Sequence, residues 1–206
     1  MTNKEKFTEL ATTRIKREGI TKLLDWLETT DFYTSPASTK YHLAVEGGLL
    51  QHSLNVYDRL LRLYEAEHGT PCAERHETIA VVALFHDVCK ANCYKKSLRN
   101  VKVYSETGTR TDNGGNYDWE TQECYVFEEK FPFGYHGPKS AFLVDRALRL
   151  TTEEYVCIAN HMGMYDRLHN DYSLAKAFET YGLAFLLHTA DCFAVFSEKE
   201  KPSDGC

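Results

Sequence analysis

The sequence of 206 residues contains no apolar run long enough to cross a lipid bilayer, for which about 20 residues are needed. Its first residues, MTNKEKFTEL, lack the apolar stretch of a secretory signal peptide. Basic residues are not in excess, because 30 Asp and Glu outnumber 24 Lys and Arg and give a net charge of −6. We therefore predict a cytoplasmic protein without membrane contact and without an extended surface for nucleic acid.

The sequence also lacks a CxxC pair and internal repeats, although it contains seven cysteines. A thiolate zinc site and a framework of disulfide bonds are therefore disfavoured. Cys89, Cys157 and Cys192 lie in apolar segments, where a reduced thiol packs as a small apolar group. Apolar residues make up 43% of the chain, which is enough for one domain with a hydrophobic core. We expect residues 1–206 to form a single domain.

Apolar periodicity predicts a mainly α protein. The expected helices cover residues 4–29, 49–68, 75–89, a segment after Pro138, a segment from Thr151 to Gly163, and 174–196. The first is interrupted near Gly19. Thr151 and Glu154 form a capping box at the start of the segment that ends at Gly163. Alternating residues around a Gly- and Asn-rich centre predict a β-hairpin-like insertion at about 98–130. The chain then divides into N-terminal helices (1–35), a core (36–197) that includes the insertion (94–135), and a polar tail (198–206).

Polar residues interrupt the apolar helices at several points. His52 borders the apolar stripe of 49–68, His86 and Asp87 follow the apolar run IAVVALF, and Asp191 lies within LAFLLHTADCFAVF. An unpaired buried carboxylate costs several kcal/mol, so two of them need a compensating charge. A divalent cation held by inward-pointing side chains of a helical bundle would supply that charge. The alternative is a set of separate hydrogen bonds within the core.

The order of these residues resembles the HD-domain superfamily of metal-dependent phosphohydrolases. GGLLQHS is similar to its first-histidine segment, ALFHDVCK to its His-Asp segment, and LLHTADCFA to its last-aspartate segment. FPFGYHGPKSAFLVDRALRLTTEEYVCIANHMGMYD extends the likeness to small stand-alone bacterial and phage members, and more distantly to the HD part of 3′–5′ exoribonucleases. Cys89 stands where glycine is usual. The resemblance covers residues 36–197 and implies an HD-domain helical bundle.

The resemblance implies a centre of one or two divalent metal ions, drawn from Mn, Fe, Co, Ni, Zn or Mg. One ion would be held by His52, His86, Asp87 and Asp191. Asp87 would bridge to a second ion, for which His136 and His161 match the additional histidines of the two-metal members. The alternative roles of these two histidines are substrate contact and proton transfer. His188, one turn before Asp191, is a candidate hydrogen-bond partner of a ligand.

Positive charge is also needed if the substrate is a phosphate. Lys90 follows the His-Asp pair and is assigned with Asp87 to catalysis, where its ammonium would neutralise phosphate oxygens. Its alternative role is that of a lysine at a helix C-terminus. Lys139 and Ser140 follow Pro138, where free backbone N–H groups would favour phosphate, with simple capping as the alternative. His42 is a further candidate for substrate binding, or a plain loop histidine.

We therefore expect a metal-dependent phosphohydrolase whose metal-activated hydroxide cleaves a phosphate ester of a small substrate, a nucleotide or short oligonucleotide. The alternatives are a 3′–5′ exonuclease or phosphodiesterase, a non-catalytic nucleotide-binding module, and a di-iron oxygenase. No OB-like segment precedes the HD region, which weighs against the exonuclease. The aromatic residues of the insertion would either stack on a base or pack the hairpin onto its domain, namely Tyr104, Tyr117, Trp119 and Tyr125.

Overall fold

The computed structural model describes residues 1–130, 134–166 and 172–199. These residues form a mainly α fold, as the sequence predicts. The helices are α1 (Asn3–Arg14), α2 (Ile20–Glu28), α3 (Gly48–His68), α4 (Ala73–Phe85), α5 (His136–Leu148), α6 (Thr152–Asn160), α7 (Ser173–Thr180) and α8 (Gly182–Glu198), with short 3₁₀-helices η1 (Val88–Lys90) and η2 (Gly163–Asp166). None of the described helices is both long and apolar enough to cross a membrane.

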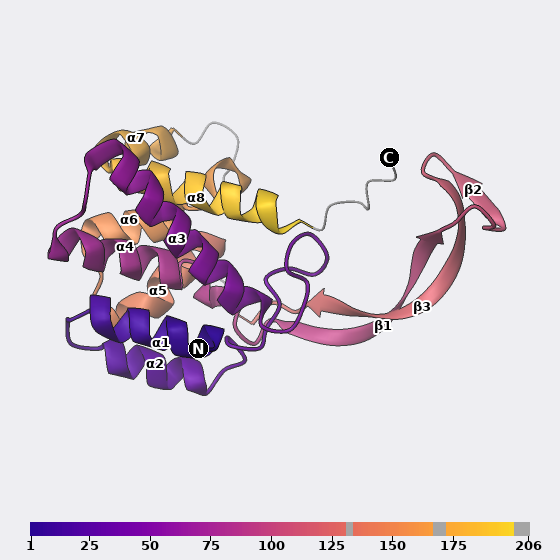
Figure 1. Cartoon of the computed structure of the whole chain (residues 1–206), viewed down its shortest axis with the longest axis horizontal. Helices are drawn as coiled ribbons and strands as arrows, with labels where there is room; N and C mark the ends of the chain where they lie inside the picture. The colour runs from indigo at the N-terminus through magenta and orange to yellow at the C-terminus, as the bar shows by residue number, and fades with distance from the viewer. Residues whose placement is uncertain (131–133, 167–171, 200–206) are drawn as a thin grey trace.

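Helix α4 is the centre of the helical body (Figure 1). Every residue from Ile79 to Phe85 is buried, and the helix packs against α1, α3 and α6. The ring of Phe7 lies 5.6 Å from that of Phe85 and 5.4 Å from that of Phe32, so aromatic packing closes one end of the core. The apolar run that precedes the His-Asp pair therefore delivers that pair into the interior.

Helix α4 ends four residues earlier than the sequence predicts. The expected helix reaches Cys89, whereas α4 ends at Phe85 and His86 is its C-cap. Asp87 leaves the helical conformation with φ −112° and ψ 15°, and the chain continues as η1. On a continuous helix, neighbouring side chains would point about 100° apart. The bend instead brings Nε2 of His86 to 3.5 Å from Oδ2 of Asp87.

Two glycines let the loop before α3 fold back onto the start of that helix. Gly47, with φ 73°, is the N-cap of α3. A Cβ atom at Gly48 would lie only 2.1 Å from the carbonyl oxygen of Leu43, so a larger residue would push the loop away. The close approach places His42 over α3, where its ring centre lies 5.1 Å from that of His52.

The C-terminal helical segment is two helices instead of the single helix expected for 174–196. Tyr181 has φ −126° and ψ 88°, which interrupts the helical hydrogen bonds and separates α7 from α8. Helix α8 then continues to Glu198, which the sequence analysis assigned to the polar tail 198–206. Glu198 is therefore a helical residue, and residues 200–206 lie outside the described part of the chain.

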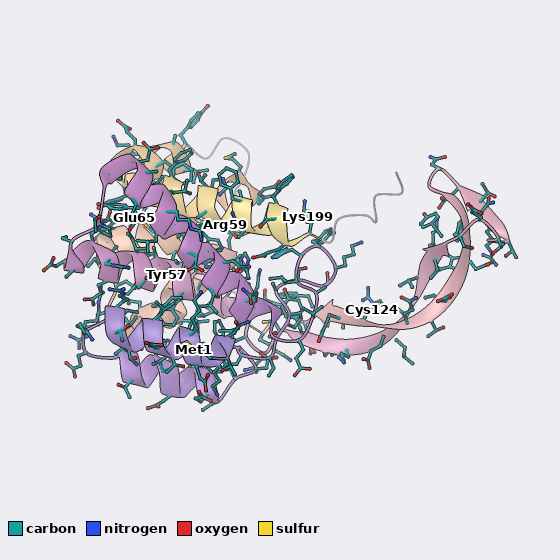
Figure 2. The ribbon with its side chains drawn as sticks, viewed as in Figure 1. Met1, Tyr57, Arg59, Glu65, Cys124 and Lys199 are labelled. Carbon is teal, nitrogen blue, oxygen red and sulfur yellow. The ribbon has the colours of Figure 1, made fainter. Side chains whose placement is uncertain are left out.

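The insertion forms an antiparallel arm of three strands in the order β1-β3-β2. The strands are β1 (Tyr94–Tyr104), β2 (Arg110–Asp112) and β3 (Gly115–Phe127). The predicted hairpin-like insertion is confirmed, and the structure adds a short third strand. Figure 1 shows the arm curving away from the helical body, and Figure 2 shows Cys124 along its length with side chains extending from both faces.

Aromatic residues near the tip of the arm contact one another. The ring centre of Tyr117 lies 5.7 Å from that of Tyr104 and 5.8 Å from that of Trp119. The ammonium of Lys102 lies 4.3 Å from the centre of the Tyr117 ring. Because the arm projects from the body (Figure 1), the interpretation that these three aromatic residues pack the hairpin onto its domain is wrong. Base stacking on the arm stays a prediction.

Arg17, in the loop between α1 and α2, links the N-terminal helices to α6. Its guanidinium donates to both carboxylate oxygens of Glu154, at 2.6 and 2.8 Å, and to Glu77 at 2.8 Å. The Glu154 side chain is fully buried, and it also accepts from the backbone N–H of Thr151 to complete the predicted capping box. Because His161 is the C-cap of α6, this ion pair fixes the helix that presents a candidate ligand.

Replacing Arg17 with alanine should lower the free energy of unfolding by about 3 kcal/mol, because the buried Glu154 carboxylate loses its counter-charge. Lys176→Ala is the control, since it removes the exposed Lys176–Glu179 pair and should cost less than about 1 kcal/mol. Urea denaturation followed by circular dichroism measures both variants. Equal losses in the two would contradict the structural role of the Arg17–Glu154 pair.

Candidate metal centre

Four helical segments bring histidines and carboxylates to one buried centre. Nε2 of His52, on α3, lies 3.1 Å from Oδ1 of Asp191 on α8 and 3.6 Å from Oδ2 of Asp87. Nε2 of His86 lies 3.3 Å from Nε2 of His52. His161, at the end of α6, reaches the opposite side of Asp87, with Nε2 3.4 Å from Oδ1. The predicted ligands therefore meet in space although they are far apart in the sequence.

The hydrogen bonds of His86 and His161 orient both rings toward this centre. Nδ1 of His86 donates to the carbonyl oxygen of Ala83 at 2.8 Å, and Nδ1 of His161 donates to that of Ile158 at 2.7 Å. The proton on Nδ1 leaves Nε2 with a lone pair, which is the form that binds a metal. Nε2 of His161 is buried and has no hydrogen-bond partner within the described residues. Burial lowers the pKa of His86 to about 4, so this ring is neutral at pH 7.

His52 is oriented by a carboxylate that the sequence analysis missed. Nδ1 of His52 donates to Oε2 of Glu198 at 2.9 Å, and Asn55 donates to Oε1 of Glu198 at 2.7 Å. The sequence does hold a signal, because Glu198 follows Asp191 by seven residues and lies on the same face of α8. Glu198 and His52 thus form a carboxylate–histidine pair on the side of the ring that faces away from the centre. Such a pair fixes the orientation of a metal-binding histidine.

His136 differs from His52, His86 and His161 because its Nδ1 contacts a thiol and not an oxygen. Sγ of Cys89 lies 3.3 Å from Nδ1 of His136, and Nε2 of His136 lies 2.5 Å from Oδ1 of Asp87. Burial raises the pKa of the Cys89 thiol to about 12, so the thiol keeps its proton and is able to donate to Nδ1. Nε2–H then donates to Asp87. As a metal ligand, His136 would need the other tautomer, in which Nδ1–H faces the sulfur.

Lys90 supplies positive charge at the same centre. Its ammonium lies 2.7 Å from Oδ2 of Asp87. Burial opposes the charged form of Lys90, but the Asp87 carboxylate outweighs it and raises the pKa of the ammonium group. Burial likewise opposes ionisation of Asp87, and Lys90 together with His86 and His136 outweighs it and holds the pKa of Asp87 well below its usual value. The two residues therefore form a charged pair at neutral pH.

A pocket of about 640 Å³ opens onto this centre. His52, Asp87, Lys90, His161 and Asp191 contribute to its lining. The predicted substrate residue His42 also lines it, and both ring nitrogens of His42 are buried without a hydrogen-bond partner among the described residues.

Lys139 and Ser140 lie on α5, outside the described lining of this pocket. The helix begins at His136 and not at Pro138, so the backbone N–H of Lys139 already donates to the carbonyl oxygen of Tyr135 at 3.0 Å. The expectation of a free N–H group at Lys139 is therefore wrong. The Lys139 ammonium pairs with Glu129, and the Ser140 hydroxyl accepts from the backbone N–H of Cys89 at 3.2 Å.

His188 contacts the backbone of a candidate ligand, in line with the role the sequence indicates. Its Nδ1 donates to the carbonyl oxygen of His161 at 2.6 Å, and its ring stacks on Phe178. A Cβ atom at Gly163 would lie 2.6 Å from the His188 ring, so glycine is required for this approach. Cys192, expected to pack as an apolar residue, is instead exposed and lines the pocket.

The donor set fits a divalent cation. Ligand atoms of His52, His86 and Asp191 lie within 4.8 Å of one another, and so do those of His86, Asp87 and His161. Imidazole nitrogen and carboxylate oxygen suit Mn, Fe, Co, Ni and Zn, so the geometry supports a possible metal centre without fixing the ion. Comparisons with protein-family models, curated proteins and solved structures found no match for this chain.

The charge of His52 should make the stability of chelator-treated protein depend on pH. Burial opposes protonation of His52, but hydrogen bonds to Asp191 and Glu198 outweigh it and raise its pKa from 6.5 to about 9. Because the pKa is higher in the folded chain, the stabilisation is complete below pH 6.5 and is lost as the pH rises through 9. We expect a loss of about 3 kcal/mol over this range.

Denaturation of chelator-treated protein at several pH values between 6 and 10 measures this loss. His52→Gln should remove the part of the pH dependence that His52 contributes and leave the part from His161, whose pKa the Asp87 carboxylate raises against burial. His68→Gln, which changes an exposed histidine on the same helix, should retain the full pH dependence. An unchanged pH dependence in His52→Gln would show that another group is responsible.

Proposed function

We propose that this chain is a metal-dependent phosphohydrolase of the HD-domain type that cleaves a phosphate ester of a nucleotide. The observation that carries the proposal is the orientation of His52, His86 and His161. Each ring donates through Nδ1 to an oxygen acceptor, so that Nε2 faces the carboxylates of Asp87 and Asp191. The resemblance to the HD superfamily supports the proposal, because its three segments contain four of these residues in the same order.

A metal ion would be held by His52, His86, Asp87 and Asp191, with His161 on the side of Asp87 where a second ion would bind. When bound, a divalent ion supplies a water molecule of lowered pKa and stabilises negative charge on phosphate oxygens. Ions and protons compete for the same nitrogen lone pairs, so the raised pKa of His52 makes binding stronger as the pH rises.

The other residues act on the substrate or on the ligands. Lys90, beside Asp87 in the pocket, is placed to attract a phosphate oxygen as negative charge develops there. His136 holds a proton on Nε2 next to Asp87 and is a candidate for proton transfer. Glu198 and His188 keep the rings of His52 and the backbone of His161 in place. His42 contributes two free ring nitrogens at the pocket.

Metal content is the first test of this function. Protein purified without chelator or affinity metal should contain one or two divalent ions per chain by elemental analysis. Asp87→Asn and Asp191→Asn should each lose this metal, because a neutral amide is a poor ligand for a divalent ion. Asp58→Asn, which changes a carboxylate paired with Lys6 away from the centre, should retain it. A well-folded wild type with no metal under these conditions would contradict the proposal.

Replacing Lys90 with methionine should separate chemistry from metal binding. Lys90→Met should keep its metal and lose about 100-fold in kcat on phosphate esters, because a charge that stabilises the transition state is removed. Lys95→Met changes an exposed lysine at the base of the arm and should keep full activity. An unchanged kcat in Lys90→Met would show that Lys90 only positions the Asp87 carboxylate and does not act on the substrate.

The same preparations distinguish the remaining functions. Release of inorganic phosphate or of a nucleotide supports hydrolysis. Bound iron with oxygen consumption and no phosphate release would favour an oxygenase instead. Metal and nucleotide binding without turnover of any ester would favour a non-catalytic binding module.

A further inference from the structure

The pocket above the candidate metal centre has two chemically different parts. Its floor holds the imidazoles and carboxylates of the centre together with Lys90. The apolar and aromatic residues of the lining, here called the wall, include Met162 and Tyr165 of the α6–η2 segment and Val195 and Phe196 of α8. Tyr165 is 87% exposed and Phe196 is 77% exposed, so these rings are available to a ligand. A bound molecule would therefore meet charge at one end and aromatic rings at the other.

Helix α8 sets the spacing between these two parts. Asp191, Val195 and Lys199 follow one another at intervals of four residues, about one turn, and line the same pocket, as does Cys192 beside Asp191. Phe196 lies five residues beyond Asp191, which corresponds to about 7.5 Å along the helix axis. This leaves room for a small polar group, such as a sugar, between a phosphate on the floor and a planar ring on the wall. Figure 2 shows Lys199 at the end of α8, near the loop between α2 and α3.

The charges of the pocket limit how many phosphates it accepts. Among the described residues of the lining, the only lysines are Lys90 and Lys199, and none is an arginine. Lys90 is already paired with Asp87. Pockets that hold a triphosphate chain need several cationic groups or backbone N–H groups for its additional oxygens. The lysines of the described lining are enough for one phosphate group, in addition to any phosphate oxygens that a metal ion would contact.

From these observations we propose that the substrate is a nucleoside carrying a single phosphate, with its base against Phe196 and Tyr165. The proposal rests on the hydrolase function and adds the class of substrate and the residues that select it. The phosphate lies at Asp87 and Lys90, and the sugar lies between them and the rings, in the part of the pocket that His42 also lines. The pocket volume of about 640 Å³ is in the range of small-molecule sites.

Phe193 provides a matched control for Phe196. It lies on the same helix and is 53% exposed, but it belongs to a neighbouring surface depression and is outside the described lining of this pocket. Phe196→Ala should raise KM for adenosine and thymidine 5′-monophosphates about tenfold, the loss expected when stacking on one ring face is removed. KM for glycerol phosphate, which has no base, should stay unchanged. Phe193→Ala should match the wild type on all three substrates.

Two further comparisons make the result decisive. Adenosine triphosphate should be at least tenfold poorer in kcat/KM than the monophosphate, and a triphosphate that equals or exceeds it would overturn the single-phosphate assignment. Equal KM values of wild type and Phe196→Ala for both nucleotides would overturn the base-binding wall.

Calorimetric binding of adenosine monophosphate to the Mn²⁺-loaded protein separates this inference from the proposed function. If no ester is hydrolysed but binding weakens about tenfold in Phe196→Ala and not in Phe193→Ala, the hydrolase function fails and the base-binding wall stands. If neither hydrolysis nor Phe196-dependent binding is found, both fail.

Discussion

The burial of two carboxylates beside three imidazoles is the constraint on which the rest of the structure depends. Asp87 and Asp191 lie inside a helical body whose central helix is apolar along its second half. Two like charges are stable there only because protonated histidines, Lys90 or a metal cation compensate them. The surrounding structure meets this need by ending α4 and α6 at histidines, and by aligning α3 and α8 so that their polar residues face inward.

Much of the fold could be predicted from the sequence because most helices carry strong local signals. The long apolar stripe of α3, the capping box of α6 and the alternating residues of the arm each indicate the right element. The bend at Asp87 and the break at Tyr181 could not be predicted in this way. Both lie next to apolar stretches whose helical pattern extends across them, and packing against other helices decides where the helices end.

The candidate site could be predicted where a polar residue lies in or directly after an apolar segment, as His52, His86, Asp87 and Asp191 do. Glu198 could not be predicted as part of the site, because its contact with His52 depends on α8 extending to residue 198, beyond the apolar pattern that predicts the helix. The contact of Cys89 with His136 joins segments 47 residues apart, so no local pattern contains it. The expected helix start at Pro138, which would leave the N–H of Lys139 free, is wrong by two residues, because packing and not a local pattern sets the start of α5 at His136.

The central claim is that the Nε2 atoms of His52 and His86 and the carboxylates of Asp87 and Asp191 surround a divalent cation. Anomalous diffraction from crystals grown with Mn²⁺ tests this directly, since it locates the ion independently of any activity. The account predicts an anomalous peak at about 2.0–2.3 Å from ligand atoms of His52, His86, Asp87 and Asp191. Crystals in which Mn²⁺ binds elsewhere, while Lys90 and the histidines alone compensate the two carboxylates, would contradict it.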